Sequence, residues 1–295
     1  MIKLRDLEYL DAIEKHRHFG KAAEACHVSQ PTLSGQIMKL EEQLGVSLIE
    51  RHPRNILLTP AGEQLLAKAR RVLVAARELE MTAKTLGDPL AGEFHLGLIP
   101  TLAPYLLPLV MPELIKKLPN LQLFLHEHKT SDLLQLLDDG TLDALVLPWL
   151  DDMHAFQAYD LFEEKFVLAV SSKHELADRK RVKLEYLQGH KVLTLEDGHC
   201  LRDQALGYCF SAGADEDKRF QATSLETLRY MVAANMGITL LPELAAGARN
   251  ADGNLRYIEF QSPAPSRRIV LLVRQNYTRL ECVRQIVGTI RACIK

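Results

Sequence analysis

The chain has 295 residues, enough for two or three domains of about 150 residues each. Its apolar content of 47% and charged content of 25% are typical of a soluble globular protein. The net charge of −2 gives no global reason to expect a nucleic-acid or membrane partner, so any such site must be local. No apolar stretch reaches the roughly 18 residues that span a bilayer, and the first residues lack a signal-peptide core, which predicts a cytoplasmic protein.

The first 60 residues predict a helix-turn-helix followed by a wing. Apolar spacing indicates a helix over about 4–13, a short helix around residues 19–26 and a third helix from Gln30 to Leu44, which Gly45 ends. A wing follows over residues 50–58, and its arginines suit phosphates or a minor groove. The side chains expected to contact DNA are Ser29, Gln30, Pro31, Thr32, Ser34, Gln36, Lys39, Arg51 and Arg54. The alternative is an ordinary helical hairpin with a solvated polar face.

A long helix is predicted from Thr59 and Pro60, a good N-cap followed by a favoured first helical residue, to about Leu86. Its apolar side needs a partner, and a second copy of the same helix is the simplest one. A linker follows over residues 87–92.

From Gly92 onward, strands and helices alternate, which predicts open α/β sheets. The expected strands cover residues 94–98, 121–126, 144–147, 161–170, 191–195, 238–241 and 268–274, and the expected helices cover 101–117, 131–138, 225–235 and 279–293. Such sheets bind ligands beyond the carboxyl ends of their strands. The loops after the first two strands, with Thr101 and Thr130, and the loop with His199 could therefore converge on a polar pocket. The alternative for each threonine is a helix cap.

Cys200 and Cys209 lie at the two ends of a predicted helix. The apolar residues from Leu201 to Phe210 recur at helical spacing, and Asp197 and Gly198 indicate a turn and N-cap just before them. A nine-residue step along a helix separates two Cα atoms by about 13 Å, whereas a disulfide needs roughly 4.4–6.8 Å. The helix and the disulfide therefore exclude each other, as a redox switch requires.

The first of these cysteines has a predicted reactive environment. The positive end of the helix dipole, with His199 and Arg202 beside it, should favour the Cys200 thiolate. The alternative is two unrelated core cysteines, and Cys26, Cys282 and Cys293 are expected to be of that kind.

Residues 1–90 resemble the winged helix-turn-helix and linker helix of LysR-type transcriptional regulators. The resemblance rests on Phe19–Ala23, Val28–Ser34, Gln36–Ile37 and Lys39–Glu41. Residues 91–295 resemble the two-lobed α/β effector domain of this family, which is similar to periplasmic binding proteins. Within that domain, residues 97–101, 196–204, 209, 213–217 and 222–229 are similar to the family members that sense hydrogen peroxide.

The resemblance implies four parts: a DNA-binding domain at 1–59, a linker and dimerisation helix at 60–90, lobe I at 91–162 plus 268–295, and lobe II at 163–267. It implies that Cys200 is oxidised to a sulfenic acid and that Cys209 then forms a reversible disulfide with it. The implied peroxide pocket consists of Pro100, Thr101, Thr130, His199, Asp203 and Arg267, where Arg267 is preferred to Arg268. The implied signal is hydrogen peroxide, without a cofactor or metal.

The resemblance also implies promoter DNA, RNA polymerase, a thiol reductant such as glutaredoxin, and a homotetramer built as a dimer of dimers. Three alternatives remain open. The first is a regulator that binds a small organic effector between the lobes. The second is a thiol peroxidase enzyme, against which the helix-turn-helix argues. The third is a metal sensor that uses His126, His128, His199 and Cys200.

Overall fold

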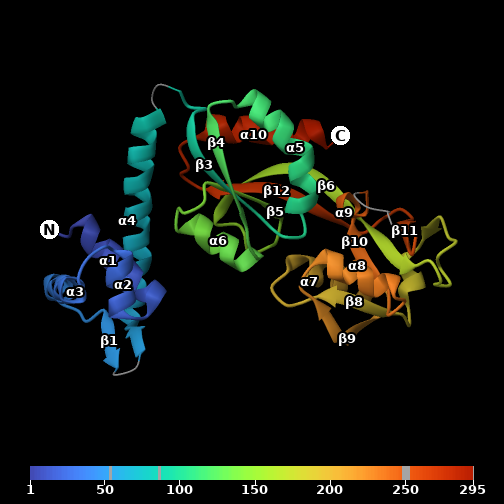
Figure 1. The fold of residues 1–295 in the computed structure, drawn as a ribbon, viewed down its shortest axis with the longest axis horizontal. Coiled ribbons are helices and arrows are strands. Elements are labelled where there is room, and N and C mark those ends of the chain that lie inside the picture. Colours follow the sequence, from blue (N-terminus) through green and yellow to red (C-terminus); the bar gives the residue numbers. More distant parts are fainter. Residues whose placement is uncertain (53–54, 86–87, 248–252, 295) are drawn as a thin grey trace. The chain divides into compact units, whose positions relative to one another are not determined.

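The computed structural model describes residues 1–52, 55–85, 88–247 and 253–294 (Figure 1). The chain divides into two compact units, residues 1–86 and 87–295. Within the described ranges, no helix has both the length and the apolar character that crossing a membrane requires.

The first unit is a winged helix-turn-helix, as predicted. Its helices are α1 (Leu4–His16), α2 (Phe19–Ala25) and α3 (Gln30–Leu44), and its wing is the antiparallel pair β1 (Ile49–His52) and β2 (Asn55–Leu58). Ser29 caps α3 because its side chain accepts the N–H of Thr32, and Gly45 ends α3 in a left-handed conformation at φ 70°. The inward faces of the helices pack around Leu10, Ile13, Leu33, Ile37 and Leu40. The opposite face of α3 is therefore left outside the core.

The long helix α4 (Pro60–Thr85) starts at the predicted cap, where Thr59 Oγ1 accepts the N–H of Gly62 at 2.9 Å. A Cβ atom at Gly62 would lie 2.1 Å from the carbonyl oxygen of Leu48, so only glycine permits this approach. Arg70 ties α4 to α1 through ion pairs with Asp11 and Glu14 at 2.7 and 2.9 Å.

The second unit is the predicted α/β domain. Its strands are β3 (Gly92–Leu98), β4 (Leu121–Glu127), β5 (Ala144–Pro148), β6 (Phe156–Ser171), β7 (Arg181–Val182), β8 (Lys191–Leu195), β9 (Asp215–Ala222), β10 (Thr239–Pro242), β11 (Leu255–Phe260) and β12 (Ser266–Arg274). Its helices are α5 (Ala103–Lys117), α6 (Thr130–Asp138), α7 (Cys200–Ser211), α8 (Leu225–Ala233), α9 (Glu243–Gly247) and α10 (Leu280–Cys293), with the short 3-10 helix η1 (Leu184–Leu187).

Strand β6 connects two lobes. The strand order is β4-β3-β5-β12-β6-β11-β7, and β10 also pairs with β6. Residues 156–165 of β6 pair with β12, whereas residues 166–171 pair with β10 and β11. Strands β3, β4 and β5 are parallel, with α5 and α10 on one face and α6 on the other (Figure 1). Each lobe has its own hydrophobic cluster, and the predicted lobe boundaries at 162/163 and 267/268 fall inside β6 and β12.

Several predicted boundaries were wrong. Strand β6 begins at Phe156 rather than Leu161, and α5 begins at Ala103 because residues 99–102 form a turn, in which Leu102 N–H donates to the Ile99 carbonyl. The N-cap of α7 is His199, and the helix starts at Cys200 rather than Leu201. Strands β9 and β11 were not predicted, because their many charged residues hide the alternation that identifies a half-buried strand.

Candidate redox site at the start of helix α7

Helix α7 carries both cysteines, and its ends belong to different hydrophobic clusters. Cys200 is the first residue of α7 and packs with the cluster of lobe I, whereas Cys209 is fully buried in the cluster of lobe II. Both thiols are free. Because the helix is wound between them, about 13 Å of helical rise separates their Cα atoms, which is beyond disulfide range.

Buried polar side chains from lobe I approach Cys200. Thr130, at the start of α6, is buried. Its side chain interacts with the Cys200 thiol, which favours the thiolate and lowers the Cys200 pKa. The positive charge of Arg267 acts on the Cys200 pKa in the same direction. Arg267 also contacts Thr101, with its Nη1 3.4 Å from Oγ1. Thr130 and Arg267 thus act directly on the thiol, whereas Thr101 contacts Arg267.

The two candidate arginines differ sharply. The Arg267 side chain is fully buried and pairs with buried Glu164, at 2.7 Å from Nη2 to Oε2. The Arg268 side chain is 54% exposed and pairs with Asp160 at the surface. Only Arg267 acts electrostatically on Cys200, as preferred from the sequence.

The prediction of a low thiol pKa was wrong. Burial is the largest influence on the Cys200 pKa and raises it above its usual value, although Thr130, Arg267 and the backbone N–H of Leu201 oppose it. The sequence revealed the helix start but not the burial. The Cys209 pKa is raised by burial to about 12.

The ionisable residues around Cys200 differ in their effects and partners. Burial lowers the His199 pKa, which favours the neutral ring, so this side chain adds no cation beside Cys200. Arg202 pairs with Glu216 at 2.9 Å and with Asp203 at 3.3 Å. Asp203 is 78% exposed, and its negative charge acts on Cys200 by raising the thiol pKa.

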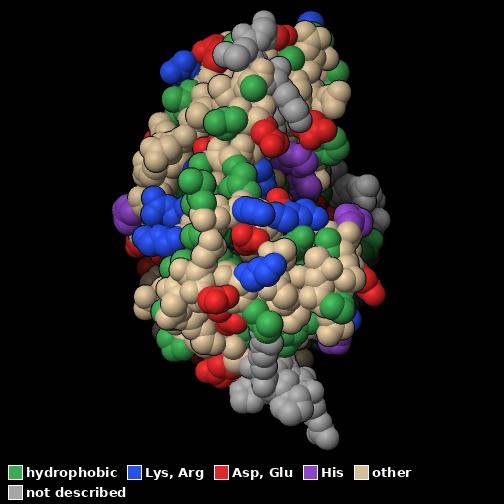
Figure 2. Space-filling model, turned by 90° about the vertical axis from the view of Figure 1, so that its left-hand side faces the viewer, with side chains coloured by type: hydrophobic (Ala, Val, Ile, Leu, Met, Phe, Trp, Pro, Cys, Tyr) green, Lys and Arg blue, Asp and Glu red, His purple; other side chains and the backbone are tan. Residues whose placement is uncertain are grey.

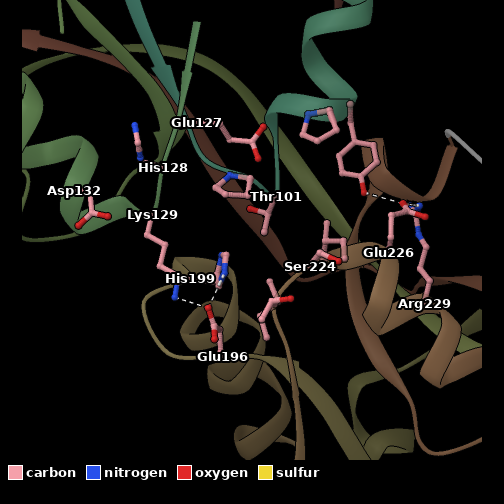
Figure 3. Close-up of a pocket in the computed structure, with 16 residues that line it drawn as sticks. Thr101, Glu127, His128, Lys129, Asp132, Glu196, His199, Ser224, Glu226 and Arg229 are labelled. Carbon is pink, nitrogen blue, oxygen red and sulfur yellow. Dashed lines mark hydrogen bonds and ion pairs between the residues drawn. The ribbon is translucent and has the colours of Figure 1, made fainter. Parts of the chain in front are cut away.

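A cleft of about 790 Å³ separates the lobes next to this site (Figure 3). Pro100, Thr101 and His199 line it, together with Lys129 and Glu196, whereas Cys200 itself is not among its lining residues. The Lys129 ammonium pairs with Glu196 at 2.5 Å and with the Asp197 carbonyl at 3.1 Å. These two contacts join the residue before α6 to the loop before α7.

A second group of cleft residues joins the lobes through α5 and α8. Tyr105 donates to Glu226 at 3.3 Å, and the Arg229 guanidinium lies 5.4 Å from the centre of the Tyr105 ring (Figure 3). Sequence reasoning did not identify these contacts, Lys129–Glu196 or Glu164–Arg267, because their partners are 67 to 124 positions apart.

The four side chains of the metal-sensor alternative are not gathered in the part of the chain that the structure describes. His126 lies on β4, where its Nε2 is 3.0 Å from Nδ1 of His95. Cys26 and Cys282 are core residues as expected, and Cys293 is half-buried at the edge of its cluster.

The predicted DNA-contacting side chains lie mainly on the free surface of the first unit. Ser29, Gln30, Pro31, Thr32 and Lys39 are exposed, and Ser34 and Gln36 are half-buried. Arg51 is on β1, but its side chain and all of Arg54 lie outside the described part of the chain. On the face in Figure 2, lysine and arginine side chains gather near the middle with acidic side chains among them, so positive charge is local, as the net charge of −2 requires.

Family models match both units. The model for the bacterial regulatory helix-turn-helix protein of the lysR family matches residues 4–63, and the LysR substrate binding domain matches residues 87–293. The chain belongs to the LysR family. As a LysR-family regulator it binds DNA, so the helical-hairpin alternative is wrong.

The chain is similar over nearly its whole length to regulators of one kind. A hydrogen peroxide-inducible genes activator of Pectobacterium carotovorum is 49% identical over 98% of this chain and 96% of its own length. The DNA-binding transcriptional dual regulator OxyR of Escherichia coli K12 is also 49% identical, over 99% of this chain and 95% of its own. Full-length OxyR of Pseudomonas aeruginosa, carrying a cysteine-to-aspartate substitution, has a TM-score of 0.78 at 33% identity and covers 99% of both chains. The LysR-family fold expected from the resemblance is therefore confirmed.

Proposed function

We propose that this LysR-family regulator senses hydrogen peroxide through Cys200 and responds with a reversible Cys200–Cys209 disulfide. The observation that carries the proposal is a wound helix whose two free cysteines pack into different hydrophobic clusters. Bridging them must unwind α7 and remove at least one sulfur from its cluster. A covalent bond thereby changes the contacts between lobes.

The chemistry has two balanced steps. The Cys200 thiolate attacks one peroxide oxygen, so that an S–O bond forms, the O–O bond breaks and hydroxide leaves, which takes up a proton. The Cys209 thiol then attacks the Cys200 sulfur, forming the S–S bond and releasing water. A dithiol reductant such as glutaredoxin reduces the disulfide by thiol–disulfide exchange, which returns both protein thiols and leaves the reductant as its own disulfide.

The residues around Cys200 have distinct proposed roles. Thr101, Thr130 and His199 hold peroxide by hydrogen bonds, beside Pro100, and the buried Thr130 side chain next to the Cys200 thiol supports this. Arg267 stabilises the thiolate and the departing hydroxide electrostatically. Asp203 helps to reset the pocket, and the action of its charge on Cys200 supports this role.

On DNA, we propose a homotetramer, arranged as a dimer of dimers, whose geometry at the promoter changes on oxidation and alters contact with RNA polymerase. Leu79 on α4 is 72% exposed, which supports pairing of α4 with a second copy. The four predicted parts of the chain would serve as DNA-binding domain, linker and two effector lobes.

Mass spectrometry of the peptide that holds both sulfurs, before and after one equivalent of peroxide, tests the proposal. We expect loss of two hydrogens from the linked pair, and Cys209→Ser should accumulate a trappable sulfenic acid at Cys200. Cys200→Ser should bind DNA but lose the peroxide response. Retained induction in this variant would refute the assignment.

A small organic effector is a second candidate, because the 790 Å³ cleft is far larger than peroxide requires and carries Lys129 and Arg229. Tight ligand binding that is unaffected by Cys200→Ser would favour it. Rapid catalytic turnover of peroxide would instead favour a thiol peroxidase.

A further inference from the structure

Two histidines and a glutamate meet at a corner of lobe II, away from the cleft. Among the described residues, His174, Glu175 and His190 form a group in which one ligand atom from each side chain lies within 4.8 Å of the others. His190 Nε2 is 3.5 Å from Glu175 Oε1, and the two imidazole rings have centroids 5.1 Å apart. The turn after β6 provides two of the side chains, and the turn before β8 provides the third.

The backbone holds both histidines in place. His174 N–H donates to the Ser171 carbonyl, and its own carbonyl accepts from Ala177. His190 N–H donates to the Leu187 carbonyl, and its carbonyl accepts from Asp215. The backbones of the two histidines are therefore fixed by turns, which lowers the entropic cost of binding a ligand.

The donor set has the chemistry of a transition-metal site. Two imidazoles and one carboxylate are a common protein ligand set for zinc, with water completing the tetrahedron. Two ligands that are each about 2.1 Å from zinc in a tetrahedron lie roughly 3.4 Å apart, which is close to the His190–Glu175 distance. We propose that His174, Glu175 and His190 bind a divalent transition-metal ion such as Zn²⁺.

Metal binding would change the hydrogen bonding of His174. His174 Nδ1 accepts the N–H of Leu176 at 3.2 Å. If Nε2 binds the metal, the ring proton must lie on Nδ1. The imidazole would then lose the hydrogen bond from Leu176 N–H and gain a bond to the metal.

The site lies beside the end of helix α7. Gly189 N–H donates to the carbonyl of Gly213, two residues after the end of α7, and Asp215 N–H donates to the His190 carbonyl. A metal that joins the two turns would therefore stabilise the turn at residues 189–190, which is hydrogen-bonded to the residues that follow α7. This inference concerns metal binding alone and does not depend on the proposed peroxide chemistry.

The test is titration of the reduced full-length chain with Zn²⁺ by calorimetry. His190→Gln should weaken one binding event by at least about 10-fold, because loss of a metal ligand costs no less than loss of a residue that only orients a ligand. His174→Asn, which keeps an acceptor for the Leu176 N–H, should do the same. His16→Gln, at an exposed histidine of α1, is the matched control and should leave binding unchanged.

Zinc also binds thiolates, so the titration is repeated on the Cys200→Ser/Cys209→Ser variant, which should retain the site. Unchanged metal-free thermal unfolding of His174→Asn and His190→Gln shows that these variants fold. The proposal is overturned if the histidine variants bind Zn²⁺ as the wild type does, or if binding disappears only in the cysteine variant. Failure of peroxide sensing would leave the metal result untouched.

Discussion

At the level of single residues, burial separates the roles of neighbouring side chains. Arg267 and Arg268 are adjacent, yet the first is enclosed with Glu164 and the second lies at the surface with Asp160. A buried ion pair leaves an uncompensated charge when one partner is removed, whereas a surface pair contributes little.

We therefore expect Arg267→Met to lower the free energy of unfolding by about 3–5 kcal/mol, because Glu164 would remain buried without an opposite charge beside it. Arg268→Met is the matched control and should cost no more than about 1 kcal/mol. Urea unfolding measures both. Arg267→Lys keeps the charge, so its Cys200 should be oxidised faster than that of a folded Arg267→Met protein; equal rates would argue against an electrostatic role.

The stability of the reduced protein should decrease at high pH. Burial raises the Cys209 pKa from 9.0 to about 12, so the folded chain retains this proton while the unfolded chain loses it. The resulting stabilisation is complete below pH 9 and is lost as the pH rises toward 12, and the raised Cys200 pKa acts in the same direction. Urea unfolding between pH 8 and 10.5 should show a shallower decrease for Cys209→Ala than for the wild type. Parallel decreases would contradict this.

At the level of elements, α7 is the one whose winding competes with the disulfide. Its stability therefore sets the balance between the reduced and oxidised forms. Gly207 lies inside α7 and is exposed, and a Cβ atom there meets nothing within 4 Å. This position offers a way to strengthen the helix without new tertiary contacts.

Gly207→Ala should stabilise wound α7 by up to about 1 kcal/mol, which favours the reduced form roughly fivefold. The equilibrium with glutathione redox buffers measures this shift. Gly288→Ala, an equally open and exposed position in α10, is the control, because it should stabilise its helix without changing that equilibrium. Equal shifts in both variants would show that α7 need not unwind.

At the level of the whole molecule, a near-neutral chain binds a polyanion through a local surface. The exposed positions of α3 include both Lys39 and small polar side chains, which suit phosphates and base edges respectively. Affinity and sequence preference should therefore respond to different substitutions.

Lys39→Ala should weaken binding to all DNA sequences about equally. It should also reduce the slope of the logarithm of the binding constant against the logarithm of the salt concentration by about one. Gln30→Ala should instead change the preference among sites. Gel shifts over a salt series, with specific and random DNA, measure both effects. A change of site preference in Lys39→Ala with a uniform loss in Gln30→Ala would reverse this division of roles.

The sequence alone determined the features that depend on local rules. Caps at Ser29 and Thr59, the apolar period of each long helix, and the nine-residue step from Cys200 to Cys209 are properties of short segments, so they could be predicted. The tertiary structure decided the protonation of Cys200, the exposure of Asp203 and the meeting of His174 with His190. These depend on burial and on contacts between distant segments, which determine solvation and charge but leave no local pattern in the chain.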